Sequence, residues 1–246
     1  MSTKWKLLII FVMIGLVLSV IRSGSRAEMS FSQIPQYVFK RNDSDPEKPM
    51  IALTFDDGPN REVTERILDV LEKYDARATF FVVGENISGA EDIIERQIKA
   101  GCLIGNHSYS HRMSGNMTDS EMLREFARTD ELLKEITGEE AMVVRPPFGK
   151  NEKRTAQLTK RPVILWSLDT LDWESQDSDE IVNAVYSSAR DGDIILMHDI
   201  FPSTAEACER IIPGLMKRGY RLVTVTELMD AKGIGLLSGE VYKDAE

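Results

Sequence analysis

The feature that most constrains the fold is an alternation of short apolar runs with helical patterns, which begins at residue 50. Strands that alternate with helices are typical of parallel βα units, in which helices cover a parallel sheet. Seven such strands favour a closed barrel over an open sheet, so we expect an α/β fold. The seven candidate strands are 50–54, 78–83, 103–105, 142–144, 163–168, 193–197 and 221–223.

Two of the intervening segments, 63–74 and 119–136, repeat apolar side chains at helical spacing. The second begins after Thr118, which forms a capping-box pattern with Glu121. These apolar stripes predict that the helices pack on the core, and they do not indicate a function. In the second helix the side chains expected to point inward are Leu123, Phe126, Leu133 and Ile136.

Composition sets the size and the class of the protein. The chain has 246 residues, 42% of them hydrophobic, which is enough for one sizeable core. A formal net charge of −10 argues against a nucleic-acid partner, which normally requires a basic surface. Cys102 and Cys208 are its two cysteines, and they either pair or remain as buried free thiols.

The N-terminal segment differs from the rest of the chain. Residues 7–21 are fifteen mostly apolar positions with lysines before them and arginines after them. This is the length of a signal-peptide core and a little short of a spanning helix of about 20 residues. We expect 1–27 to be a signal-anchor, or else a cleaved signal peptide. A catalytic domain at 49–232 would then lie outside the cytoplasm, tethered to the cell membrane or secreted, between a polar linker at 28–48 and a peripheral tail at 233–246.

The reactive residues fall where the predicted strands end. Asp56 and Asp57 follow the first strand, the two histidines of "HSYSH", His107 and His111, follow the third, and His198 ends the sixth. These are the three histidines of the chain. Because the carboxyl ends of parallel strands share one mouth of a barrel, we expect these side chains to lie together there.

Their chemistry indicates a metal site. Histidines four residues apart in a turn-like segment can face the same way. Two imidazoles and one carboxylate form a common open site for a divalent metal, with Asp56 or Asp57 as the carboxylate. The other aspartate would then interact with a water bound to the metal. Zinc suits this set best, although cobalt or manganese can occupy it.

Five short motifs resemble one known family. "TFDDGP", "HSYSH", "RPPFG", "DTLDW" and "LMH" look like the motifs of the polysaccharide deacetylases, which form the NodB homology domain or carbohydrate esterase family 4. They appear in the family's order between residues 49 and 229. The resemblance implies a distorted (β/α) barrel with a groove for a β-linked glycan, and metal-dependent hydrolysis of an acetyl group.

The resemblance also implies roles for single residues. Asp57, His107 and His111 match the metal ligands, Asp56 matches the general base and His198 the general acid. The remaining matches complete the site: Arg145 pairs with the base, Asp172 orients the acid, the backbone N–H of Phe148 is an oxyanion donor, and Trp173 and Leu196 line the acetyl pocket.

The substrate is less constrained than the chemistry. Phe148 stands where the family more often has tyrosine, which bears on substrate preference. Peptidoglycan, with its N-acetylglucosamine, is the leading substrate for an exported deacetylase, while chito-oligosaccharides, xylan and exopolysaccharides are alternatives. A catalytically inactive glycan-binding module is a further alternative, and Asp169 is interpreted as a hydrogen-bonding loop residue.

Overall fold

The computed structural model describes residues 48–245. The predicted N-terminal segment at 1–27 and all but the last residue of the predicted linker lie outside this range. Within it, no helix combines the length and the apolar character that crossing a membrane requires. The strands are β1 (Met50–Asp56), β2 (Thr79–Val82), β3 (Leu103–Asn106), β4 (Val163–Ile164), β5 (Leu168–Asp169), β6 (Ile194–His198), β7 (Arg221–Leu222) and β8 (Val241–Tyr242).

The strands are parallel, as the alternation predicts. The main sheet has the order β3-β2-β1-β6-β5, and β7 pairs with the first two residues of β1. Val144 extends this sheet, because it bridges Asn106 of β3 on one side and Val163 of β4 on the other. The strands thus form the distorted (β/α) barrel that the sequence resemblance implies.

The segment predicted as one strand at 163–168 is instead two short strands. Its first half, β4, pairs with β8, and its second half, β5, pairs with β6. Between them the backbone changes partner: Leu165 N–H donates to Tyr242 O, and Ser167 N–H donates to Ile194 O. The predicted strand at 142–144 is likewise reduced to the isolated bridge at Val144. Apolar content alone does not reveal such a change of partner.

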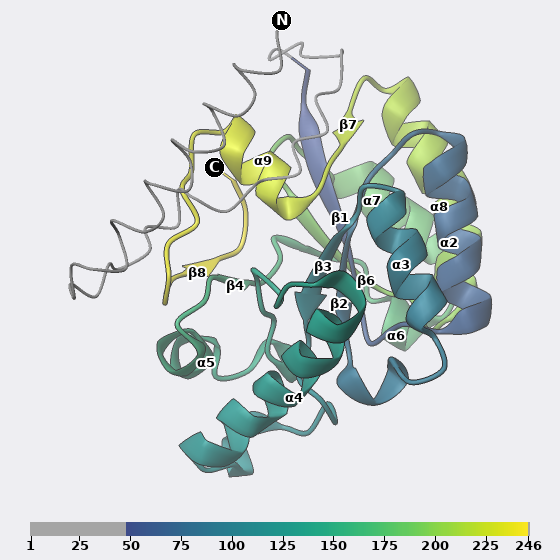
Figure 1. Ribbon diagram of the computed structural model, residues 1–246. Helices are drawn as coiled ribbons and strands as arrows, with labels where there is room; N and C mark the ends of the chain where they lie inside the picture. Colours follow the sequence, from purple (N-terminus) through teal and green to yellow (C-terminus); the bar gives the residue numbers. More distant parts are fainter. Residues whose placement is uncertain (1–47, 246) are drawn as a thin grey trace, which may run out of the picture. The chain divides into compact units, whose positions relative to one another are not determined.

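Side chains alternate across β1, and this alternation separates the core from the site. Ile51, Leu53 and Phe55 pack in the cluster that contains the inner faces of the helices. Figure 1 shows α2 (Arg61–Lys73), α3 (Glu91–Lys99), α7 (Ser178–Ser188) and α8 (Pro202–Lys217) together on one side of the strands. The even-numbered residues of β1 point the other way, because successive strand side chains face opposite sides. Asp56 is the last of them.

The second long predicted helix is α4 (Asp119–Thr137), and its capping box at Thr118 and Glu121 is confirmed. Phe126 and Leu133 are buried as expected. Leu123 is 40% exposed, however, so its predicted inward position is wrong, and its neighbour Met122 is buried instead. Ile136 is partly buried against the core, so the inward stripe departs from the predicted one at its first position. The remaining helices are α5 (Glu152–Thr159), α6 (Asp172–Ser175) and α9 (Val225–Ala231).

The tail that the sequence marked as peripheral contributes to the fold. Its residues Val241 and Tyr242 form β8 and pair with β4, and Ala245 is buried. Two paired residues are too short a pattern to predict from sequence. Cys102 and Cys208 are both buried and free, so of the two expectations the free thiols are the one observed.

Candidate functional site

The register of β1 and β6 sets two of the predicted site residues side by side. Asp56 is the direct partner of His198, and Thr54 is the partner of Leu196. Paired residues on neighbouring strands share one face and lie about 4.8 Å apart. The final residues of two central strands thus project an acid and an imidazole to the same side.

Asp57 leaves the strand in a left-handed conformation, with φ of 75°. The amide of Asn86 donates to its carbonyl at 2.8 Å, which helps to hold this turn. The next residue, Gly58, has no side chain, and a Cβ there would overlap the carboxylate of Asp199. The turn places the Asp57 carboxylate against the loop after β3, where Asp57 Oδ1 and Asp56 Oδ2 each lie 3.5 Å from His107 Nε2.

Asp199 was not predicted as part of the site, although it stands directly after His198 at a strand end. Its Oδ2 accepts a hydrogen bond from the hydroxyl of Thr64 at 2.6 Å, and within residues 48–245 its buried Oδ1 has no hydrogen-bond partner. Burial raises its pKa to about 7, with Asp57 and Asp56 adding to the rise and the Thr64 hydrogen bond opposing it.

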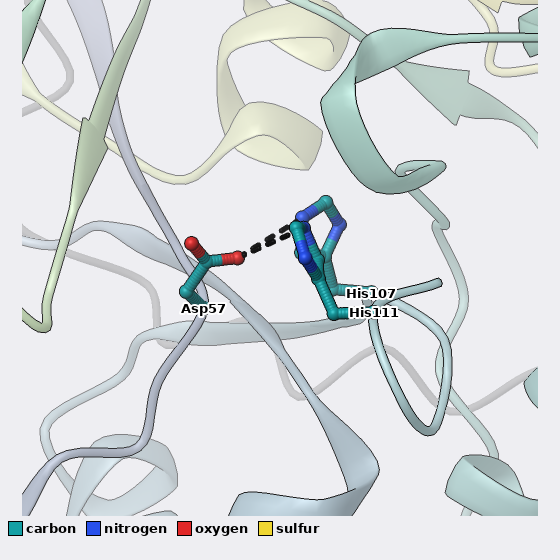
Figure 2. A group of neighbouring side chains, drawn as sticks. All are labelled: Asp57, His107 and His111. Atoms are coloured by element: carbon teal, nitrogen blue, oxygen red, sulfur yellow. Dashed lines mark ion pairs between the residues drawn. The ribbon is translucent and has the colours of Figure 1, made fainter. Parts of the chain in front are cut away.

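Asp57, His107 and His111 converge on one point (Figure 2). Asp57 Oδ1 lies 3.2 Å from His111 Nε2 and 3.5 Å from His107 Nε2, and the three ligand atoms all lie within 4.8 Å of one another. Asp57 Oδ1 is buried without a well-aligned hydrogen-bond donor among the described residues. One carboxylate oxygen facing two imidazole nitrogens is a donor set that suits a divalent cation.

The lowered pKa values of Asp57 and His111 favour cation binding, whereas the raised pKa of His107 opposes it. His107 Nδ1 lies 2.7 Å from Arg145 O, which fixes Nδ1 as the donor and leaves Nε2 with a lone pair. Burial opposes ionisation of Asp57, but His107, His111 and His198 outweigh it and lower its pKa to about 2. Burial and His107 lower the pKa of His111, whereas Asp56 and Asp57 raise that of His107 despite its burial. A proton therefore competes with a cation for His107 Nε2.

Asp56 is paired with a buried arginine. Arg145 Nη1 donates to Asp56 Oδ1 at 2.6 Å, and the arginine side chain is 0% exposed. Its remaining donors bind Thr54 Oγ1, Ile164 O and Leu165 O at 2.8–2.9 Å. Asp56 Oδ2 faces His107 Nε2 at 3.5 Å. One oxygen of Asp56 is thus held by Arg145 and the other faces the histidines. Thr54 was missed because a strand threonine carries no distinguishing signal.

His198 is held by Asp172. Its Nδ1 lies 2.7 Å from Asp172 Oδ1, and its backbone N–H donates to Asp172 Oδ2 at the same distance. Asp172 is 0% exposed, and its Oδ2 also accepts from the hydroxyl of Thr204, which sequence reasoning missed. Burial disfavours the imidazolium, but the hydrogen bond and charge of Asp172, reinforced by Asp56 and Asp57, raise the pKa of His198 to about 9.

Two of the other predicted site residues lie at the surface. Phe148 is 51% exposed, has a φ of 60°, and packs its ring against His111 with 4.6 Å between the ring centroids. Trp173 is 49% exposed, whereas Leu196 is buried in β6. Asp169 Oδ1 accepts from the N–H of Leu171 at 2.9 Å, the loop role that the sequence indicated.

Comparison with known proteins shows the class to which this fold and site belong. The family model "Polysaccharide deacetylase" matches residues 43–162. A peptidoglycan-N-acetylglucosamine deacetylase of Bacillus cereus is 36% identical over 191 residues, which are 74% of this chain and 89% of that protein. The chain belongs to the polysaccharide deacetylase family.

Two further relatives show how the similarity is distributed. The peptidoglycan-N-acetylmuramic acid deacetylase PdaC of Bacillus subtilis is 39% identical over 193 residues, and the match spans 78% of this chain but 41% of PdaC. A family 4 acetyl xylan esterase of Clostridium thermocellum, solved in complex with a cobalt ion, has a TM-score of 0.75 and 36% identity, covering 79% of this chain and 98% of that one. The region matched by the family model, residues 43–162, contains Asp56, Asp57, His107, His111 and Arg145.

Proposed function

We propose that this protein is a metal-dependent hydrolase that removes acetyl groups from an N-acetylated glycan, with N-acetylglucosamine of peptidoglycan as its substrate. The observation that carries the proposal is the convergence of Asp57, His107 and His111 beside two further pairs, Asp56 with Arg145 and His198 with Asp172. These seven residues supply a cation site, a base paired with a cation and an acid paired with a carboxylate.

The residues present suit a divalent metal, and we propose zinc. Asp57 Oδ1 and the Nε2 atoms of His107 and His111 would hold it, since each of these atoms faces the same point. Two nitrogens and one carboxylate oxygen suit zinc, and the cobalt in the acetyl xylan esterase structure shows that a relative can hold another ion. When bound, such an ion polarises a carbonyl and lowers the pKa of a bound water from 15.7 to about 7.

Asp56 would act as the general base. Its Oδ1 is occupied by Arg145 and its Oδ2 faces the histidines, so Oδ2 is the oxygen that can take the proton of an attacking water. Arg145 is fixed by four hydrogen bonds, so it holds the carboxylate in place. A base that is already held in position needs no further ordering before it takes the proton of the water.

His198 would act as the general acid that protonates the leaving nitrogen. Asp172 binds its Nδ1, so the proton for transfer is on Nε2. With a pKa of about 9, His198 is protonated at neutral pH, as an acid must be before the step. Asp172 would therefore both orient the ring and keep it charged.

The exposed aromatic residues would bind the substrate. The family resemblance makes the Phe148 backbone N–H the candidate donor to the developing oxyanion, and the Phe148 ring lies beside His111. Losing one such donor typically costs about 2.7–4 kcal/mol of transition-state stabilisation. Trp173 and Leu196 would line the acetyl pocket, with the half-exposed Trp173 also available to the sugar.

Acetyl xylan is the second candidate substrate, because the acetyl xylan esterase structure shares the fold at 36% identity. Peptidoglycan is preferred because both sequence relatives named above are peptidoglycan deacetylases.

We further propose that residues 7–21 anchor the protein at the cell membrane with the catalytic domain outside, which the fifteen mostly apolar positions support. Release of the protein into the medium would contradict the anchor.

The test measures acetate released from purified peptidoglycan, chito-oligosaccharide and acetyl xylan, with and without a chelator, followed by add-back of zinc, cobalt or manganese. We expect release from peptidoglycan to stop on chelation and to return most strongly with zinc. Asp56→Asn should abolish release while glycan binding persists, and Asp69→Asn, on the exposed surface of α2, is the matched control. Equal release by wild type and Asp56→Asn would refute the proposal, and glycan binding by the wild type without acetate release would indicate the inactive module.

A further inference from the structure

The loop that carries His107 and His111 adopts a costly backbone conformation. Ser108 has a φ of 68° and His111 a φ of 49°, in the left-handed region. A residue other than glycine in this region costs on the order of 1–3 kcal/mol, so surrounding contacts must hold it there. The two histidines face Asp57 only while these contacts persist.

Helix α4 supplies contacts to the second half of the loop through Glu125. Glu125 Oε2 accepts from both the backbone N–H and the hydroxyl of Ser110, each at 2.8 Å. Its Oε1 accepts from Arg112 Nη2 at 3.1 Å. Ser110 and Arg112 flank His111 on both sides, and the Glu125 side chain is only 11% exposed. One carboxylate therefore binds the backbone immediately before a metal-ligand candidate and the side chain of the residue immediately after it.

The same helix also holds the start of the loop, through a separate contact. Asp130 Oδ1 accepts from the side-chain amide of Asn106 at 2.8 Å, and Asn106 Oδ1 accepts from the N–H of Ser108 at 2.9 Å. Arg161 pairs with Asp130 at 2.7 Å and balances its charge. His107 is therefore bracketed by Asn106 and Ser108, which this network holds, while Glu125 contacts the two residues that flank His111.

We infer that Glu125 is a positioning residue for the metal site: by binding Ser110 and Arg112 it holds His111 in the left-handed conformation that points Nε2 at Asp57. The inference rests on the proposed metal site but does not depend on which glycan is cleaved. Residues that orient a metal ligand commonly contribute about 10–100-fold in metal affinity, because without them the ligand must be ordered when the ion binds.

The experiment compares Glu125→Ala and Glu125→Gln with Glu131→Ala, which changes an exposed glutamate of the same helix. For the full chain we would measure the zinc Kd by chelator competition, the cobalt absorption spectrum, and the urea midpoint in the presence of chelator. We expect Glu125→Ala to raise the zinc Kd about 10–100-fold and to alter the cobalt spectrum. Glu125→Gln, which keeps an acceptor oxygen, should raise the Kd less, and Glu131→Ala should stay within about twofold of wild type.

The outcomes separate positioning from general stability. A lower urea midpoint for Glu125→Ala with an unchanged Kd and spectrum would overturn the inference, as would a Kd within about twofold of wild type for both Glu125 variants. Should the alanine variant fail to fold, Glu125→Gln still decides, because an unchanged Kd and cobalt spectrum there refute the role. Wild type that binds zinc but releases no acetate would count against the proposed function and leave the role of Glu125 intact.

Discussion

Replacement of Asp172 by asparagine tests the pairing on which the proposed acid depends. In the wild type the pKa of His198 is about 9, against an ordinary value of 6.5, because Asp172 outweighs the effect of burial. The difference between 6.5 and about 9 corresponds to about 3 kcal/mol of extra stability for the charged form. Asp172→Asn removes the charge and leaves Asp56 and Asp57 alone to oppose burial, so the pKa of His198 should fall well below about 9.

The sign of the effect on stability follows from the direction of this shift. A raised pKa stabilises the fold fully below pH 6.5, where His198 is protonated in both the folded and unfolded states, and this contribution is lost as pH rises through about 9. The wild type should therefore lose about 3 kcal/mol of unfolding free energy across this window, and Asp172→Asn should lack that loss. Urea unfolding of the metal-free protein at several pH values measures it.

Two further measurements accompany the unfolding series. NMR titration of the His198 ring reports its pKa directly. The rate of acetate release should fall above about pH 9 in the wild type, where His198 loses its proton, and this fall should move to lower pH in Asp172→Asn. Asp169→Asn is the matched control, since Asp169 binds the N–H of Leu171 rather than a histidine. If Asp172→Asn kept both the titration of His198 near pH 9 and the wild-type pH dependence of stability, the reasoning would be refuted.

Two other predictions concern buried groups. Arg145→Ala should cost about 3–5 kcal/mol of unfolding free energy in urea denaturation, because it leaves the Asp56 carboxylate buried without its cation. The control Arg66→Ala, at an exposed ion pair, should cost under about 1 kcal/mol. A similarly small loss for Arg145→Ala would contradict the importance of the buried pair. Burial raises the pKa of Cys102 to about 12 and also raises that of Cys208, so a thiol reagent at pH 8 should label neither in the native protein and both after denaturation; rapid native labelling would disprove their burial.

The α/β class followed from the sequence because it rests on local patterns. Alternating apolar runs and amphipathic helices predicted parallel strands, and the capping box fixed the start of α4 within one residue. The errors have one cause. The segment at 163–168 changes partner from β8 to β6, and Leu123 lies one position away from the inward stripe. Both depend on which neighbour a residue meets, and the identity of the residue does not determine that.

The candidate site was predicted as a set of residue types at strand ends, and the structure brings Asp57, His107 and His111 together as that set requires. The contacts around them were not predicted. Thr204, Asn106 and Glu125 carry no local signal, because a threonine, an asparagine and a glutamate on a helix or strand are ordinary there. Their partners lie on other elements, so only the fold shows that they hold the site residues.

By itself the sequence determined the α/β class, the central strands and the two long amphipathic helices, the order of the reactive groups along the chain, and which groups could act as ligand, base or acid. The tertiary structure decided which oxygen of Asp56 faces the histidines, which nitrogen of each histidine is available, and how strongly His198 holds its proton. The physical reason is the distance along the chain over which each effect acts. Propensity and periodicity act within a few residues, whereas hydrogen-bond direction, burial and charge at a site are set by segments far apart in the chain.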